Sequence, residues 1–220
     1  EDDILIKDGA EVTATGEGSG IYADDGSVTI SGGAVVTATG ETYPGIEASG
    51  SVTISGDAVV TATGEQGYGI SAYGSVTIRG EGTVVTAAGG SEIYEDYTDY
   101  YDGICAEDDI LITDGAEVTA TGDGGGIFAD GGSVTISGGA VVTATGEMYA
   151  GIYSEEGSVT IRGENTVVTA AGGSYIDEDD TYYYDGIYAY YDILIEDGAE
   201  VTATGDGSGI YADDGSVTIS

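Results

Sequence analysis

The chain has 220 residues, of which 41 are acidic and only 3 are basic, so its formal net charge is −38. A charge of this size repels nucleic acids and anionic membrane surfaces, which argues against DNA or RNA as partners. Disordered chains with a similar charge lack apolar residues. Here 40% of the residues are hydrophobic and recur in a fixed order, and no apolar run is long enough for a membrane span. The composition therefore indicates a folded protein that does not insert into membranes.

A short phrase of the form Ser-Val-Thr-Ile or Asp-Ile-Leu-Ile recurs along the whole chain. Its successive copies are 24 or 25 residues apart, except for two spacings of 34 residues. The copies begin at Asp3, Ser27, Ser51, Ser75, Asp109, Ser133, Ser158, Asp192 and Ser216. A period of this length predicts a solenoid, in which each repeat forms one coil.

Each coil contains three short runs of β-forming residues, separated by glycine-rich turns. In the second coil these runs cover residues 28–30, 35–39 and 45–48. Three strands in about 24 residues correspond to one turn of a three-sided parallel β-helix. The sequence predicts an all-β fold without helices, in which residues 1–220 form a single β-solenoid of eight to nine coils. Because residues 3–31 and 192–220 differ at only two positions, we interpret the chain as a segment of a longer repetitive rod.

The alternation of side chains along each strand predicts the inner and outer faces, because successive side chains in a strand point to opposite sides. Ile30, Val36 and Ile46 of the second coil have equivalents in the other coils, and these apolar columns are predicted to form the core. Thr37 and Thr39 alternate with the core positions and are predicted to point outward. The outward column of the third strand carries aromatic residues, namely Tyr22, Phe128, Tyr153, Tyr188 and Tyr211. Cys105 lies in the same column, and we interpret it as a surface thiol without a reactive role.

An acidic residue follows the Thr-Ala-Thr-Gly phrase in six coils, and we call this column the acidic ladder. Its members are Glu17, Glu41, Glu65, Asp123, Glu147 and Asp206. Stacked coils lie roughly 4.8 Å apart, so the carboxylates would repel one another or collect a counter-cation. Rows of hard oxygen ligands suit Ca²⁺, and we predict Ca²⁺ binding with Glu17, Glu41 and Glu65 as ligands. The alternative is a solvated acidic edge that discourages aggregation.

Two coils carry insertions at the same place in the repeat, over residues 91–102 and 174–185. Each insertion holds five carboxylates, and together they hold eight of the eighteen tyrosines. The insertions start three coils apart, so they would project from one edge, with coils five and six forming the floor of a cleft between them. Long loops on a rigid scaffold are frequent binding sites, and tyrosine rings stack well on sugars. The alternative is that the insertions only pack on the solenoid or contact neighbouring rods.

These insertions supply most of the predicted site residues. The predicted ligand-binding residues are Tyr94, Tyr97, Tyr100, Tyr101, Tyr175, Tyr182, Tyr183 and Tyr184. The predicted metal ligands, besides the three glutamates of the acidic ladder, are Asp96, Asp99, Asp102, Asp177, Asp179 and Asp185.

The phrase "SVTISGGAVVTATGE…GI.A..GSVTI" resembles the calcium-containing, carbohydrate-binding parallel β-helix domains found on the surface of cellulolytic bacteria. The resemblance extends over every coil and depends on a simple repeat. It implies a right-handed helix with three sheets, bound Ca²⁺, and binding of pectic acid or cellulose without catalysis. The two insertions and the extreme charge depart from the family pattern, because an anionic pectin would approach this surface only through calcium bridges.

Four functions remain open. The first is an extracellular, cell-surface module that binds polysaccharide or acts as an adhesin. The second is a structural stalk or filament segment that associates end to end or laterally with neighbouring solenoid chains. The third is ice binding through the outward threonine pairs. An enzyme is disfavoured because the chain has no histidine and its three basic residues occupy repeat positions.

Overall fold

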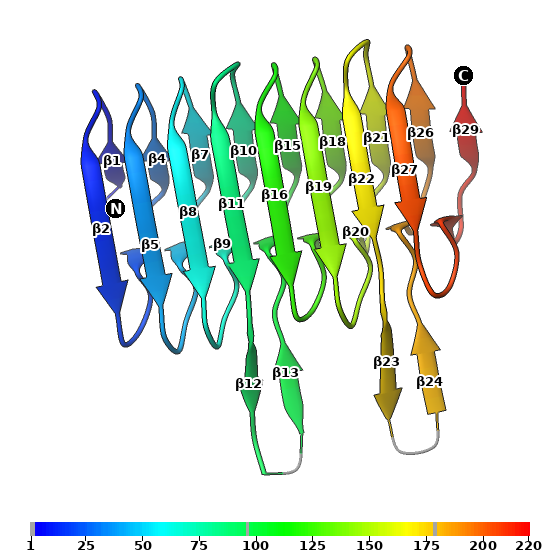
Figure 1. Ribbon diagram of the computed structural model, residues 1–220, viewed down its shortest axis with the longest axis horizontal. Coiled ribbons are helices and arrows are strands. Elements are labelled where there is room, and N and C mark those ends of the chain that lie inside the picture. Colours follow the sequence, from blue (N-terminus) through cyan, green and yellow to red (C-terminus); the bar gives the residue numbers. More distant parts are fainter. Residues whose placement is uncertain (1–2, 96, 178–179) are drawn as a thin grey trace.

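The computed structural model describes residues 3–95, 97–177 and 180–220, with Asp177 and Asp180 described in their backbone alone. The described residues form strands and turns without a helix. The chain winds through three parallel sheets, which we call sheets A, B and C (Figure 1). In Figure 1 sheet B lies in front and runs downward, sheet A lies behind and runs upward, and the coils advance from left to right. The winding is therefore right-handed, and the predicted parallel β-solenoid is confirmed.

The strands of the three sheets follow one another in the order A, B, C within every coil. Sheet A contains β1 (Ile4–Ile6), β4 (Val28–Ile30), β7 (Val52–Ser55), β10 (Val76–Arg79), β15 (Ile110–Thr113), β18 (Val134–Ser137), β21 (Val159–Arg162), β26 (Ile193–Glu196) and β29 (Val217–Ile219). Sheet B contains β2 (Glu11–Gly16), β5 (Val35–Gly40), β8 (Val59–Gly64), β11 (Val84–Gly89), β16 (Glu117–Gly122), β19 (Val141–Gly146), β22 (Val167–Ala171) and β27 (Glu200–Thr204). Sheet C contains β3 (Ile21–Ala23), β6 (Ile46–Ala48), β9 (Ile70–Ala72), β14 (Ile104–Ala106), β17 (Ile127–Ala129), β20 (Ile152–Ser154), β25 (Ile187–Ala189) and β28 (Ile210–Ala212).

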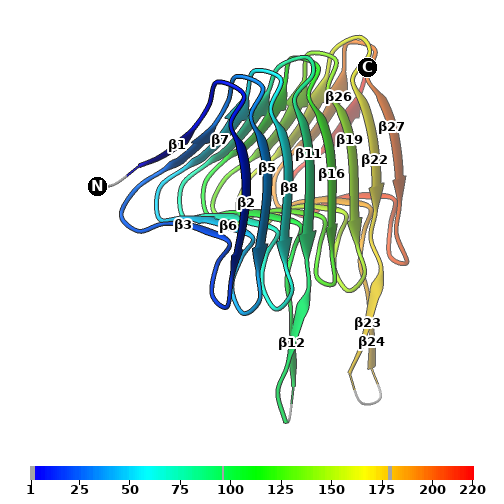
Figure 2. The same cartoon turned by 60° about the vertical axis from the view of Figure 1, so that its left-hand side comes forward.

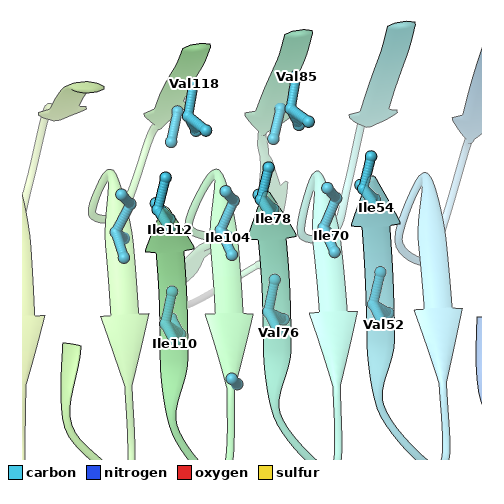
Figure 3. Close-up of a cluster of buried hydrophobic side chains, with 14 of the residues drawn as sticks. Val52, Ile54, Ile70, Val76, Ile78, Val85, Ile104, Ile110, Ile112 and Val118 are labelled. Atoms are coloured by element: carbon cyan, nitrogen blue, oxygen red, sulfur yellow. The ribbon is translucent and has the colours of Figure 1, made fainter. Parts of the chain in front are cut away.

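The core consists of the inward columns that the alternation predicts. Figure 3 shows side chains from the three sheets pointing toward one another between the walls, among them Ile78 of sheet A, Val85 of sheet B and Ile104 of sheet C. All three are buried. Burial of one isoleucine side chain contributes about 1.5–3 kcal/mol to the free energy of unfolding. Because the coils bury equivalent side chains, their contributions to stability are similar to one another. Thr37 is exposed and Thr39 is half-buried on the outer face of sheet B, which confirms the predicted register.

The first residue of each coil explains why the repeat begins with either serine or aspartate. In six coils the side-chain oxygen at this position accepts a hydrogen bond from the backbone N–H of the equivalent residue in the next coil. Ser27 Oγ accepts from the Ser51 N–H at 3.1 Å, and Asp109 Oδ1 accepts from the Ser133 N–H at 2.8 Å. Either residue type supplies the acceptor, so the two are interchangeable in this column.

The two insertions form antiparallel β-hairpins. The first hairpin pairs β12 (Ser91–Ile93) with β13 (Thr98–Tyr100), and the second pairs β23 (Ser174–Asp177) with β24 (Asp180–Tyr183). Each hairpin connects a strand of sheet B to the following strand of sheet C. Figures 1 and 2 show that both extend beyond the same edge of the solenoid. The sequence analysis predicted loops at this edge, and it did not anticipate their strand pairing.

Candidate binding cleft

The two hairpins and the two coils between them, together with Tyr68 of coil three and Tyr188 of β25, line a cleft of about 510 Å³. Eight of its twelve lining residues are aromatic, so the lining of the cleft consists mainly of rings. These residues are Tyr68, Tyr100, Phe128, Tyr149, Tyr153, Tyr183, Tyr184 and Tyr188. We call this feature the tyrosine cleft. It lies over coils five and six, where the sequence analysis placed a cleft floor.

The floor of the cleft is a row of rings on the outer face of sheet C. Phe128, Tyr153 and Tyr188 are register partners on β17, β20 and β25, so the parallel pairing stacks them one coil above another. The ring centroids of Phe128 and Tyr153 lie 5.1 Å apart with nearly parallel planes, and those of Tyr153 and Tyr188 lie 4.7 Å apart. Aromatic contacts of this kind contribute about 0.5–1.5 kcal/mol each. The floor is therefore held in place before any ligand arrives.

Ring contacts also fix the walls of the cleft. Tyr184 of the second hairpin packs edge-on against Tyr149 of coil six, with ring centroids 5.2 Å apart. Tyr100 of the first hairpin contacts Tyr175 of the second hairpin, with centroids 5.9 Å apart. The two hairpins thus touch each other across the intervening coils. Tyr183 lines the cleft with its side chain 63% exposed, so it remains accessible to a ligand.

Several phenol groups of the cleft stay protonated at neutral pH. Burial raises the pKa of Tyr149, Tyr153, Tyr184 and Tyr188 above the ordinary value of 10. Each hydroxyl can therefore donate as well as accept a hydrogen bond. The cleft combines apolar ring faces with neutral donors, a chemistry that suits hydroxyl-rich ligands.

Asp102 and Asp185 occupy equivalent positions where each hairpin rejoins the solenoid, and both line the cleft. Asp102 Oδ1 accepts a hydrogen bond from the Gly125 N–H at 2.6 Å, and Asp185 Oδ1 accepts from the Ser208 N–H at 2.6 Å. A side chain at position 125 would meet Asp102, since its Cβ would lie 2.8 Å from Asp102 Oδ1. Both carboxylates therefore tie a hairpin to the next coil.

Burial distinguishes the two aspartates. Asp102 is only 7% exposed, whereas Asp185 is half-buried. Burial raises the pKa of Asp102 to about 7, although the Gly125 N–H lowers it in part. The carboxyl of Asp102 therefore changes charge near neutral pH, inside a cleft whose other acidic lining residue is Asp185.

The remaining predicted tyrosines lie in and around the hairpins. Tyr101 packs edge-on against Tyr68 with ring centroids 5.1 Å apart, and Tyr175 stacks with Tyr182 at 6.3 Å. Tyr94 stacks on Tyr97 at 4.5 Å in the first hairpin, and neither of these two lines the cleft. The structure thus brings Tyr100, Tyr183 and Tyr184 together at the cleft and uses the others mainly in ring packing.

The predicted metal ligands that the structure describes do not form one cluster. The turns that carry Glu17, Glu41 and Glu65 stack in register, with the Glu41 N–H donating to the Gly16 carbonyl at 3.0 Å, and all three side chains are exposed. Asp99 is exposed on β13. Asp96 and Asp179 lie outside the described residues, as does the side chain of Asp177. In the part of the chain that the structure describes, no group of three or more acidic or cysteine side chains is placed to hold a metal ion, and Ca²⁺ binding by these residues stays a prediction.

Several cleft residues were not among the predicted ligand-binding residues. The sequence pattern placed three of them, Phe128, Tyr153 and Tyr188, in one outward column, and this column could have indicated an aromatic surface. Tyr68 and Tyr149 lie in short turns, where their contribution depends on ring packing between coils. Cys105 lies in the outward column as expected, but it is half-buried, and burial raises the pKa of its thiol. Its thiol is therefore protonated at neutral pH and unreactive as a nucleophile.

Within the described residues there is no helix whose length and apolar character would allow it to cross a membrane. The searches of curated proteins and of solved structures found no match to this chain. The family profile described as Beta helix repeat matches residues 28–51, 52–75 and 134–152. These matched segments cover coils two, three and six, the last of which contributes to the cleft floor. The comparison supports a parallel β-helix repeat domain, in agreement with the three-sheet solenoid.

Proposed function

We propose that this protein is a non-catalytic, extracellular β-solenoid that binds a polysaccharide chain in the tyrosine cleft. The observation that carries this proposal is the cleft itself, in which rings from two hairpins and two coils converge. Its volume of about 510 Å³ falls within the usual range of small-molecule sites, about 300–1,000 Å³. Sugar rings present apolar C–H faces to aromatic rings and hydroxyl groups to phenols. Both types of surface occur side by side on the cleft lining.

The two cleft aspartates support binding over catalysis. Glycoside hydrolases generally place two carboxyl groups about 5–9.5 Å apart across the scissile bond. Asp102 and Asp185 belong to coils three steps apart, which corresponds to roughly 14 Å at the usual strand spacing. Each carboxylate also accepts a backbone N–H of the next coil. Their separation and their hydrogen bonds therefore differ from those of a general acid that is paired with a nucleophile or base.

A glycan array, run with and without Ca²⁺, tests this function. We expect hits among neutral or amino polysaccharides, because the charge of −38 repels anionic chains unless cations bridge them. Titration of a hit should then show that Tyr183→Ala weakens binding by about tenfold, the loss of roughly one stacked ring. Tyr183 has the advantage of high exposure, so the substitution leaves the core intact. Tyr73→Ala serves as the matched control, because Tyr73 is 57% exposed and lies outside the cleft lining.

The Ca²⁺ component of the proposal is limited to loose association. Stacked turns align the glutamates of the acidic ladder along one edge, and divalent cations would relieve their mutual repulsion. A hit that appears only with Ca²⁺ would indicate an anionic polysaccharide held by calcium bridges. The complete absence of glycan hits in both conditions would contradict the proposed function.

A structural or ice-binding rod is a second candidate, and the regularity of sheet B favours it. Thr37, Thr61 and their equivalents are register partners, so threonine hydroxyls form parallel columns on its outer face. A second column contains Thr39 and Thr63, and Ala88 and Ala171 interrupt it. Under this alternative, Thr61→Val in sheet B would change lateral assembly or ice growth, whereas Tyr183→Ala would change neither.

A further inference from the structure

A second hollow of about 540 Å³ adjoins the tyrosine cleft on the outer side of sheet C. Tyr153 and Tyr188 line both spaces, so the two hollows meet at these rings. The second hollow continues onto the turns that follow β20, β25 and β28. Its other lining residues are Glu155, Glu156, Tyr190, Tyr191 and Asp213. We call this part the acidic groove.

The walls of the acidic groove are again held by tyrosines. Tyr190 and Tyr191 pack edge-on with ring centroids 4.9 Å apart, and the Tyr190 hydroxyl donates to Asp214 Oδ2 at 3.1 Å. The Tyr211 hydroxyl donates to Asp213 Oδ1 at 3.1 Å. The groove is therefore an aromatic surface with fixed rings, bordered by carboxylates at one end.

The charge of the groove is uncompensated by its own lining. Three of its seven lining residues are acidic and none is basic. Burial raises the pKa of Glu155, and the neighbouring Asp130 and Glu156 raise it further, which indicates a concentrated negative potential. These carboxylates do not belong to any group among the described residues that could hold a metal ion. Three carboxylates along one groove can form ion pairs with several cationic groups along a chain.

We infer that the groove selects a polysaccharide with protonated amino groups, such as a glucosamine polymer, with its sugar rings on Tyr153 and Tyr188 and its ammonium groups beside Glu155, Glu156 and Asp213. This inference rests on the proposed function and names the ligand class for the same site. Stacking on tyrosine requires a flat ring, and cations additionally favour the faces of aromatic rings. A lysine-rich peptide would supply the cations without the flat sugar faces, so the aromatic floor favours the amino sugar.

The inference is tested by calorimetric titration of the full chain with hexamers of glucosamine, N-acetylglucosamine and glucose. The titration is done at about pH 5.5, where the amines are protonated and most carboxylates are ionised. We expect the glucosamine hexamer to bind at least about tenfold more tightly than the glucose hexamer. The triple variant Glu155→Gln, Glu156→Gln and Asp213→Asn should reduce this preference to about twofold or less. The glucose hexamer should bind both proteins alike.

The triple variant Asp57→Asn, Glu81→Gln and Glu164→Gln is the matched control. It removes the same number of negative charges from the turns between sheets A and B, away from the groove. An equal loss of preference in both triple variants would overturn the inference, because it would reflect net charge alone. Equal binding of all three hexamers would overturn it while leaving the proposed function intact. Failure of every hexamer to bind would also overturn the inference, and the glycan array would then decide on the proposed function. Tighter binding of a lysine hexapeptide than of the glucosamine hexamer would likewise overturn the inference.

Discussion

The outer faces of sheets B and C belong to the same coils, yet they differ in how strictly the repeat is kept. On sheet B, threonine occupies the position of Thr37 in all eight strands. On sheet C, the outward column reads Tyr22, Glu47, Ser71, Cys105, Phe128, Tyr153, Tyr188 and Tyr211. The inward columns are regular in both sheets apart from Ser154 in the alanine column of sheet C, so core packing does not explain the difference. Variation on one face of a rigid scaffold is where specific recognition would arise.

Removal of a hairpin should produce the largest difference between the two faces. We propose to replace residues 90–102 with Asp-Gly-Gly, the short turn that coil five uses at residues 123–125. Polysaccharide binding should fall below detection, because the cleft loses Tyr100 and one of its walls. The solenoid should still fold, since the short turn closes coil five. Circular dichroism would check the fold, and retention of binding would show that the cleft is not the site.

Gly126→Ala should destabilise the corner that positions both faces. The added Cβ would lie 2.5 Å from the Gly151 carbonyl oxygen and 2.6 Å from the Thr145 backbone nitrogen. Two backbone contacts of this kind cannot be relieved by a side-chain movement, so we expect a loss of about 3 kcal/mol or more in the free energy of unfolding. Urea denaturation measures it. Gly18→Ala is the control, because its Cβ would meet only Tyr43 at 3.5 Å, and an equal effect in both variants would contradict this account.

Asp102→Asn should make stability less dependent on pH. The pKa of Asp102 is about 7 in the folded chain against an ordinary value of 3.8, so between these values the folded state binds a proton that the unfolded state has released. The stability that this group contributes is therefore present below the ordinary pKa and is lost as the pH rises through about 7. Asparagine keeps the Oδ1 acceptor for the Gly125 N–H and carries no charge.

We therefore expect Asp102→Asn to match the parent protein at about pH 4 and to be more stable by about 1–3 kcal/mol at about pH 8. Urea unfolding at both pH values measures the difference. Asp185→Asn is the control, because Asp185 makes the same hydrogen bond from a half-buried position. A stabilisation at pH 8 that is equal in both variants would show that general charge repulsion, and not the burial of Asp102, is responsible.

Calcium should have the smallest effect. The acidic ladder runs along the corner between sheets B and C, and its exposed glutamates attract cations without forming a chelating group. We expect Ca²⁺ to raise the melting temperature by about 2–4 °C above Na⁺ at matched ionic strength, which corresponds to about 1 kcal/mol. The additional rise in melting temperature with Ca²⁺ should disappear in the triple variant Glu17→Gln, Glu41→Gln and Glu65→Gln. An identical rise with both salts would reduce the cation effect to screening.

The repeat predicted the solenoid and its faces well, for a physical reason. Every coil repeats the same inward positions. The spacing between the equivalents of Ile30, Val36 and Ile46 along the sequence therefore indicates which residues stack on one another in the solenoid. The hairpins were recognised as insertions, but their strand pairing was not, because the runs on each side of the turn are short. Asp102 was predicted as a metal ligand, whereas its visible partner is the Gly125 N–H of the next coil. Such a partner is a backbone group and leaves no signature in the sequence.

The central claim is that ligand contacts lie on sheet C and its hairpins, while sheet B serves as scaffold. Backbone and methyl NMR spectra of the 22.0 kDa chain, recorded as a glucosamine or glucose hexamer is added, test this claim directly. The account predicts chemical-shift changes at Phe128, Tyr153, Tyr183 and Tyr188, with the threonine signals of sheet B unmoved. Changes that follow the columns of Thr37 and Thr39 instead, with the cleft signals unmoved, would contradict it.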